Sequence, residues 1–439
     1  MAKNYKLRIL HLSDLHERVC LDWMNEERKA KVRSGAASRY RVFGPSFIEI
    51  LKEIAHEGVI DLVCFTGDIA DWALPEEYES ARIKVRDIFD AAGISENDFF
   101  LVPGNHDVQR KSCDPIAEET RGNAWRKIRE YAIDYPERVS DWLTGQKPPL
   151  GAKGEWVDQN LQRGNEFWRW VAEDLGLKEL HPSKSPHKKL GYQVFWKKQK
   201  LPFPLWIIGL DSAWLSGDDN DEGKLYLTGK QIDLLTTDKN GKPLEGYRLV
   251  LIHHPITSLA DGNEAFRKLS GTVDLLLHGH QHEPNIRTTN DPDYSLRCFA
   301  SGSLYEGDRG DNWINSFHLI TTVLNPEGRP LNYQIQFFGW SPNGHWHRTD
   351  TFYKTSRNGL LALDVTNEGK CLPVAKKMRK EIIQKENNVS GDLAGNNIVI
   401  GDVLEKNKRE VLPKMVRQVR NTVGGDLAGG SVFKNRKND

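Results

Sequence analysis

The stretch LRILHLSDLHE, residues 7–17, joins a run of apolar residues to a cluster of polar side chains. A short run rich in Leu and Ile predicts a strand that is buried on both faces. Asp14 and His16 follow directly at the end of this run. Because residues i and i+2 of an extended chain point to the same side, both side chains can reach one ion. The stretch therefore predicts a buried strand that carries a metal-binding pair.

Five later runs repeat this pattern of apolar residues followed by polar ones. They are IDLVCFTGD (60–68), DFFLVPGNHD (98–107), LWIIGLDS (205–212), YRLVLIHHP (247–255) and VDLLLHGHQH (273–282). A helical pattern at 44–58 precedes the run at 60–68, and a second one at 75–93 separates that run from the run at 98–107. Gly58 is the expected end of the earlier helix. Alternating strands and helices predict a layered α/β fold, whose ligand crevice lies at the carboxyl ends of the strands.

The segment 108–204 interrupts this alternation, and it is rich in tryptophan and in amphipathic helical patterns. We interpret it as an inserted, mainly helical cap. Its tryptophans are expected to serve packing, and a surface that stacks a nucleobase is the alternative. Residues 314–353 return to strand patterns and complete a main domain over residues 1–365.

Residues 366–439 form a basic linker and a repeat tail. The segment NNVSGDLAGNN (387–397) recurs as NTVGGDLAGGS (421–431), at an offset of 34 residues. The repeats are expected near 387–400 and 421–433. A short repeat cannot bury its apolar face alone, so the tail either packs as two Gly-rich strand–turn units or serves homo-oligomerisation or the capture of a signalling partner.

Composition limits the class of protein. The 439 residues contain 61 Lys and Arg against 61 Asp and Glu, so the net charge indicates neither a nucleic-acid nor a membrane partner. The five cysteines show no CxxC spacing, which favours a reducing compartment. The N-terminus shows no leader pattern, and no stretch reaches the roughly 18 apolar residues of a membrane span. We expect a cytoplasmic protein.

The polar groups at the strand ends are carboxylates, an amide and imidazoles. Such donors suit Mn, Fe, Zn or Ni. Their number is too large for a single ion, and a carboxylate can bridge two ions that lie about 3.5–4 Å apart and clamp a phosphoryl group. The pattern therefore predicts a two-metal site.

The ordered motifs SDLH, GDIAD, GNHD, HHP and GHQH resemble those of the calcineurin-like metallophosphoesterase family, over about residues 7–355. The resemblance implies a four-layer αββα sandwich and hydrolysis of a phosphoester with two divalent ions, of which manganese is favoured. It implies a first metal held by Asp14, His16 and His282, and a bridging Asp68. It implies a second metal held by Asn105, His253 and His280. His106 then resembles the histidine that contacts the phosphate and protonates the leaving oxygen.

Neighbouring polar residues allow other assignments. His254 is the alternative to His253, which is preferred because of its spacing from Pro255. Asp107 is expected to support His106 or a turn, whereas Asp71 is expected to cap a helix and Asp211 to support the end of a strand.

The resemblance implies an enzyme, and its motif style favours a phosphodiesterase that acts on a nucleotide or nucleic acid. A nuclease of the DNA-repair branch is the alternative within the family, and a scaffold without catalysis is the alternative from another class. The tail loosely resembles Gly/Asn-rich signalling repeats of bacterial effectors, which implies an effector switched by assembly, as in antiviral defence.

Overall fold

The computed structural model describes residues 3–110, 124–197, 201–217, 220–290, 295–305, 314–341 and 343–365, together with short strands between residues 381 and 432. The chain divides into two compact units, Met1–Thr366 and Asn367–Asp439. All of the predicted ligand residues lie in the first unit, and both repeats lie in the second.

The first sheet of the larger unit has the order β12–β11–β10–β1–β2–β3, and β13 also pairs with β11. Its strands β1, β2 and β3 run parallel, so their carboxyl ends meet at one edge. They correspond to the predicted strands at 7–14, 60–68 and 98–107, which are confirmed. The bounds of the seven strands are β1 Tyr5–Leu12, β2 Leu62–Phe65, β3 Phe99–Leu101, β10 Ser316–Leu324, β11 Pro330–Trp340, β12 Trp346–Arg348 and β13 Leu360–Asp364.

The second sheet has the order β4–β5–β6–β7–β9–β8. Its strands β5, β6 and β7 are also parallel, and they confirm the predicted strands at 205–212, 247–255 and 273–282. The bounds of the six strands are β4 Tyr192–Phe195, β5 Leu205–Gly209, β6 Tyr247–Leu251, β7 Leu275–His278, β8 Asn285–Asn290 and β9 Ser295–Ala300.

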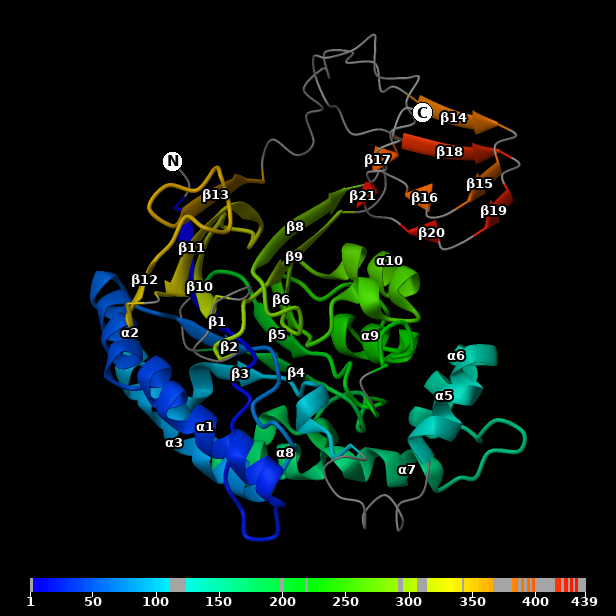
Figure 1. Cartoon of the computed structure of the whole chain (residues 1–439), viewed down its shortest axis with the longest axis horizontal. Coiled ribbons are helices and arrows are strands. Elements are labelled where there is room, and N and C mark those ends of the chain that lie inside the picture. Colours follow the sequence, from blue (N-terminus) through cyan, green and yellow to red (C-terminus); the bar gives the residue numbers. More distant parts are fainter. Residues whose placement is uncertain are drawn as a thin grey trace, which may run out of the picture. The chain divides into compact units, whose positions relative to one another are not determined.

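Helices cover the outer face of each sheet. In Figure 1 the blue helices α1 (Glu26–Phe43), α2 (Pro45–Glu57) and α3 (Pro75–Ala92) lie beside the first sheet, and the green helices α9 (Gly229–Thr236) and α10 (Gly262–Thr272) lie beside the second. Helix α2 starts at Pro45, whose missing N–H costs nothing in a first turn, and it ends at Glu57, followed by the predicted stop residue Gly58 as its C-cap. Its apolar face buries Ile50 and Ile54.

The apolar core is split by the second sheet. On β5, Ile207 packs into the cluster between the two sheets, whereas its neighbour Ile208 packs into the cluster under α9 and α10. Leu249 and Val250 on β6 divide in the same way. This sheet is therefore buried on both faces, as the unbroken apolar runs predicted. The layers run helix, sheet, sheet, helix, which confirms the predicted four-layer αββα sandwich.

The interrupting segment contributes the helices α5 (Ala124–Asp134), α6 (Pro136–Leu143), α7 (Trp156–Leu161) and α8 (Asn165–Arg169), and its last part forms β4. The tryptophans at 125, 142, 168 and 170 are all buried, which supports the packing interpretation over a base-stacking surface.

The smaller unit contains eight short strands among its described residues. They are β14 Glu381–Lys385, β15 Asn388–Ser390, β16 Leu393–Ala394, β17 Asn397–Ile398, β18 Met415–Val419, β19 Thr422–Gly424, β20 Leu427–Ala428 and β21 Ser431–Val432. Each strand of the first four pairs with the corresponding strand of the second four.

Candidate metal centre

The loops that follow β1 and β2 are bound to each other through their backbones. The N–H of Asp14 donates to the carbonyl of Gly67 (3.0 Å), and the N–H of His16 donates to the carbonyl of Asp68 (2.9 Å). Gly67 has φ +96°, and a Cβ atom there would lie 2.6 Å from Nδ1 of His253. Only glycine fits this turn without strain. The paired loops thus place Asp14, His16 and Asp68 side by side.

The loop that follows β3 brings two more of the predicted residues to the same place. Residues Asn105–Asp107 form a short 3-10 turn. The backbone N–H of His106 donates to Oδ1 of Asp68 (2.8 Å). Gly104 is essential here, because a Cβ atom at this position would overlap the carboxylate of Asp68. Asn105 is consequently held beside Asp68 by the backbone rather than by its own side chain.

The second sheet supplies the remaining histidines. His253 follows β6, and its Nδ1 donates to the carbonyl of Thr66 (2.7 Å), which leaves Nε2 facing Oδ1 of Asn105 (3.0 Å) and Oδ2 of Asp68 (3.3 Å). His280 follows β7, and its Nδ1 lies 3.1 Å from the same oxygen of Asn105. A backbone acceptor that fixes the ring of a metal-ligating histidine is common in metal sites.

His282 completes the arrangement on the opposite side. Its Nε2 lies 3.2 Å from Oδ1 of Asp14 and 3.5 Å from Nε2 of His16. Asp14, His16 and His282 therefore form one group whose candidate ligand atoms all lie within 4.8 Å of one another, and Asp14, Asp68 and His253 form a second such group. The structure brings all seven predicted ligand residues together.

The donor set fits divalent ions. It consists of carboxylate oxygens, one amide oxygen and imidazole nitrogens, which are the ligands that Mn, Fe and Zn accept. Four of the residues come from the first sheet (Asp14, His16, Asp68, Asn105) and three from the second (His253, His280, His282). Which residue binds which ion stays a prediction.

The charges of the site depend on one another. Burial would raise the pKa of Asp14, but its hydrogen bond to His282 and the nearby histidines lower it to about 2. Burial is likewise outweighed at Asp68, where His253 and His106 hold the pKa well below its ordinary value. Burial would lower the pKa of His253, but the carboxylate of Asp68 raises it to about 9. The site therefore presents two buried carboxylates that stay ionised at neutral pH.

His106 lies at the edge of this group, and its side chain is 25 % exposed. Its Nδ1 donates to the carbonyl of Asp71 (2.8 Å), and its ring packs edge-on against His16 with centroids 4.7 Å apart. Burial lowers its pKa. Because Nδ1 is engaged by a backbone acceptor, Nε2 is the nitrogen that can exchange a proton with a ligand.

Asp71 has a different role from the helix cap that the sequence suggested. Helix α3 begins at Pro75 after Leu74, so Asp71 does not cap it and that expectation was wrong. Its carboxylate instead pairs with Arg18 (2.7 Å) and lies 3.6 Å from Nδ1 of His16. Asp71 therefore lies behind the site and contacts a predicted ligand.

Asp107 supports the turn, which was one of the two roles expected for it. Its Oδ2 accepts hydrogen bonds from the N–H groups of Gly104 (2.9 Å) and Ile69 (3.2 Å), and its Oδ1 accepts from Ala70 (3.0 Å). One buried carboxylate thus binds the loop after β2 to the loop after β3.

His254 is held differently from His253. Its Nδ1 is hydrogen-bonded to Oγ of Ser212 (2.9 Å), and its side chain lines a cleft beside the metal centre. Nε2 of His253 faces Asp68 directly. His253, His254 and His280 form a further group whose candidate ligand atoms all lie within 4.8 Å of one another. Whether His253 or His254 binds an ion stays a prediction.

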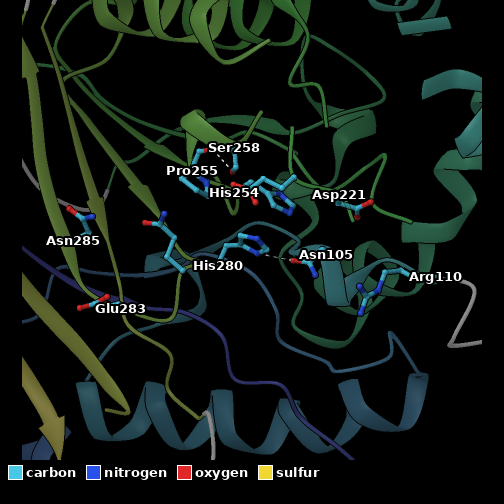
Figure 2. A pocket seen from close by; sticks show the side chains of 11 residues that line it. Asn105, Arg110, Asp221, His254, Pro255, Ser258, His280, Glu283 and Asn285 are labelled. Atoms are coloured by element: carbon cyan, nitrogen blue, oxygen red, sulfur yellow. Dashed lines mark hydrogen bonds between the residues drawn. The ribbon is translucent and has the colours of Figure 1, made fainter. Parts of the chain in front are cut away.

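The cleft has a volume of about 570 Å³ and opens next to Asn105 and His280. Figure 2 shows Arg110 and Asp221 on one side of it and Glu283 and Asn285 on the other. Nη2 of Arg110 lies 3.5 Å from both ring nitrogens of His106. Our sequence analysis missed Arg110, although its position three residues after the GNHD motif was a usable signal.

Comparison with known proteins agrees with the motifs. The sequence profile of the family described as calcineurin-like phosphoesterase matches residues 7–284, which is more than half of the chain. A metallophosphoesterase-like protein of Bacillus subtilis, YydB, is 24 % identical over 296 residues, or 65 % of this chain. The match spans about half of the length of that relative.

Solved structures show weaker similarity. The NAD nucleotidase NadN of Haemophilus influenzae is 12 % identical, with a TM-score of 0.34 over 79 % of this chain and 54 % of its own. The sulfate thiohydrolase SoxB of Thermus thermophilus is 13 % identical, with a TM-score of 0.34 over 75 % of this chain and 56 % of its own. Among the helices of the described residues, none has the length and hydropathy needed to cross a membrane.

Proposed function

This chain belongs to the calcineurin-like phosphoesterase family, and from that premise we propose that it hydrolyses phosphoester bonds with two divalent metal ions. One observation carries the proposal. Seven side chains from five loops of two separate sheets converge on one small volume, and their atoms are all of the kind that divalent ions accept. The two sheets would have no structural reason to collect four histidines and two carboxylates in this way without an ion.

We assign a role to each residue of the centre. Asp14, His16 and His282 would hold the first ion, Asn105, His253 and His280 the second, and Asp68 would bridge them. When bound, such ions activate water and stabilise the charge that develops on a phosphoryl group. His106 would contact the phosphate and give a proton to the leaving oxygen from Nε2, while the carbonyl of Asp71 holds its ring in place through Nδ1.

The charges around the cleft favour a phosphodiester as the substrate. Three carboxylates line it, those of Glu222, Glu283 and Asp221, of which Asp221 is ion-paired with Arg129. Arg110 is the basic side chain beside the phosphate position. A phosphomonoester carries up to two negative charges and is repelled more strongly than a diester, which carries one. We therefore favour a nucleotide-like diester, with manganese as the first ion to test.

Two alternative functions predict different hydrolysis of the two test substrates. A nuclease of the DNA-repair branch would cleave single-stranded DNA better than a small diester. A scaffold without catalysis would hydrolyse neither substrate, with or without metal. The presence of a suitable side chain at every implied ligand position favours an enzyme over the scaffold.

The experiment is hydrolysis of a chromogenic diester and of single-stranded DNA, each with Mn²⁺ and with an excess of chelator. We expect Mn²⁺-dependent turnover of the small diester that chelator abolishes. His106→Ala and Asp68→Ala should each lower kcat by about a hundredfold or more. His345→Ala is the matched control, because His345 is exposed in a turn.

Full activity in the presence of chelator would refute the two-metal mechanism. Faster cleavage of DNA than of the small diester would replace our substrate assignment by the nuclease. A Mn²⁺-loaded protein that hydrolyses neither substrate would support the scaffold.

We also propose that the repeat-bearing segment serves interaction rather than catalysis, with other copies of the chain or with a signalling partner, as in an effector of antiviral defence that is switched by assembly. Activity in the cytoplasm is part of the same proposal, because the cysteines Cys20, Cys64 and Cys298 are free thiols in the structure.

A further inference from the structure

The smaller unit shows a constant pairing register. Val389 pairs with Val423, Leu393 with Leu427 and Asn397 with Ser431, and the strands are parallel in every case. β14 and β18 pair in the same way, with Glu381 opposite Met415. The offset is 34 residues in all four strand pairs, which equals the offset of the sequence repeat.

This register means that each repeat forms one layer and that equivalent positions of the two repeats lie on top of each other. Parallel, in-register stacking of equivalent segments pairs backbone groups with the layers above and below, at a spacing of about 4.7–4.8 Å. The identical segment Gly-Asp-Leu-Ala-Gly (391–395 and 425–429) contains the paired strands β16 and β20. The sequence repeat and the backbone pairing therefore describe the same two-layer stack.

Each layer has a partner on one side only. Among the described residues, each of the eight strands belongs to a sheet of two strands. The outer edges of such a pair carry backbone N–H and C=O groups that can accept another strand. Because the two layers are equivalent, the edge left open by the second repeat matches the edge that the first repeat offers.

We propose that the smaller unit stacks end to end with the same unit of further copies of this chain. The second repeat of one copy would pair in parallel with the first repeat of the next, in the register already present within the chain. Such a contact is head to tail, so it does not close on itself and adds copies without a fixed limit. The inference concerns the smaller unit alone and does not depend on the proposed phosphoesterase activity.

The net charge of the segment should make the proposed stacking depend on salt concentration. Residues 376–439 contain 14 Lys and Arg against 8 Asp and Glu, an excess of six positive charges per copy. Copies that each carry this excess repel one another, so their repulsion opposes assembly. Salt screens this repulsion within about 10 Å at 0.1 M ionic strength. We expect stacking to strengthen as salt concentration rises.

The register gives a sharp test by disulfide cross-linking. Ser390 and Gly424 are paired within one chain, so Gly424 of one copy should lie next to Ser390 of the following copy. We would prepare the full chain with Cys20, Cys113 and Cys371 replaced by serine and then introduce either Ser390→Cys or Gly424→Cys. Adjacent layers bring the two Cα atoms to about 4.8 Å, within disulfide range, whereas identical positions of neighbouring copies lie about 9.5 Å apart.

We expect the mixture of the two variants to form a cross-linked dimer on oxidation, at least tenfold more than either variant alone. Equal cross-linking in all three samples would overturn the proposed register. No cross-linking in any sample, with a monomeric mass by light scattering at every protein and salt concentration, would overturn stacking itself.

A second pair of variants tests the backbone. Val389→Pro with Val423→Pro removes two N–H donors from the paired strands, whereas Val389→Ile with Val423→Ile keeps them. The proline variant should stay monomeric and the isoleucine variant should assemble like the wild type. Diester hydrolysis, measured in parallel, shows independently that the larger unit is folded and active. Assembly of the proline variant at the wild-type level would contradict the proposal.

Discussion

Five of the proposed metal ligands have a left-handed backbone. Asp14, His16, Asp68, His280 and His282 have φ between 48° and 69°. This conformation costs roughly 1–2 kcal/mol for a residue other than glycine. Such outliers gather at functional sites, where the surrounding structure holds them in place. The chain accepts this cost at the very positions where a side chain is needed for an ion.

His282 allows this cost to be measured. In the absence of metal, His282→Gly should be more stable towards urea than His282→Ala by about 1 kcal/mol, because glycine adopts a positive φ without strain. Both variants should lose Mn²⁺-dependent hydrolysis. As a matched control, Lys52→Gly in the middle of α2 should be less stable than Lys52→Ala. Equal stability of the two His282 variants would show that the site is not strained.

Arg110 is the residue that we expect to bind substrate beside His106. Arg110→Ala should raise the KM for the diester about tenfold, because one charge-assisted hydrogen bond to the substrate is lost. The affinity for Mn²⁺ should stay unchanged. Arg267→Ala, an exposed change on α10, is the control. Steady-state kinetics and a metal titration measure the two quantities. An unchanged KM would remove Arg110 from the binding site.

At the scale of the elements, the loops after β2 and β3 work as one piece because Asp107 holds both. In the wild-type protein these backbone N–H groups donate to the carboxylate of Asp107. Asp107→Asn places an amide N–H₂, which is a donor, against them. We expect the affinity for Mn²⁺ to fall by about tenfold to a hundredfold, the usual effect of losing a residue that orients ligands. Calorimetric titration measures this loss.

Tyr78→Phe is the control for that experiment. It removes the hydroxyl that lies 3.2 Å from the Asp107 carboxylate and 3.3 Å from the Asp107 backbone carbonyl, and it keeps all three backbone donors in place. Its Mn²⁺ affinity should stay within about threefold of the wild type. If Asp107→Asn binds Mn²⁺ as tightly as this variant does, the two loops do not need the carboxylate.

The end of β5 carries a buried carboxylate with a predictable pH dependence. Burial raises the pKa of Asp211 to about 7. Between about pH 4 and pH 7 the unfolded chain has lost this proton while the folded chain keeps it. The free energy of unfolding should therefore fall as pH rises through this window, by at most about 1.4 kcal/mol per pH unit from this group. Asp211→Asn should remove that slope, whereas the exposed Asp87→Asn should not.

The sequence predicted the elements that depend on apolar runs, and it missed the residues whose roles depend on loop geometry. Strands β1, β2, β5, β6 and β7 are each buried on both faces, so their composition alone identifies them. Asp71 and Arg110 were misjudged because their partners, Arg18 and His106, meet them only after the loops fold. The edge strand β4 was missed because it lies in a segment dominated by helices and is only half buried.

At the scale of the whole molecule, the metal centre lies where the two sheets meet and takes ligands from both. Ions that bind here would therefore join the layers of the sandwich and bind only the folded state. At a hundredfold excess over Kd, one ion contributes about 2.7 kcal/mol of stability. For a unit of this size we expect Mn²⁺ to raise Tm by about 3 °C per ion.

Scanning calorimetry in Mn²⁺ and in chelator measures this shift. Asp14→Asn should lose most of it, because Asp14 takes part in two of the four candidate ligand groups among the described residues. The exposed Asp87→Asn should keep it. A Tm that does not respond to Mn²⁺ in the wild-type protein would mean that the two sheets are not joined by ions.

The inserted helices have a consequence for how this enzyme can change. None of the seven proposed ligands lies between residues 108 and 204, yet Arg110, inside the insertion, and Asp221, beyond its end, both line the cleft. Under the proposed function, the metal ligands and part of the substrate cleft would be encoded in separate parts of the gene. Recombination that exchanges the insertion together with its flanks would give the protein a new substrate while leaving its reaction intact.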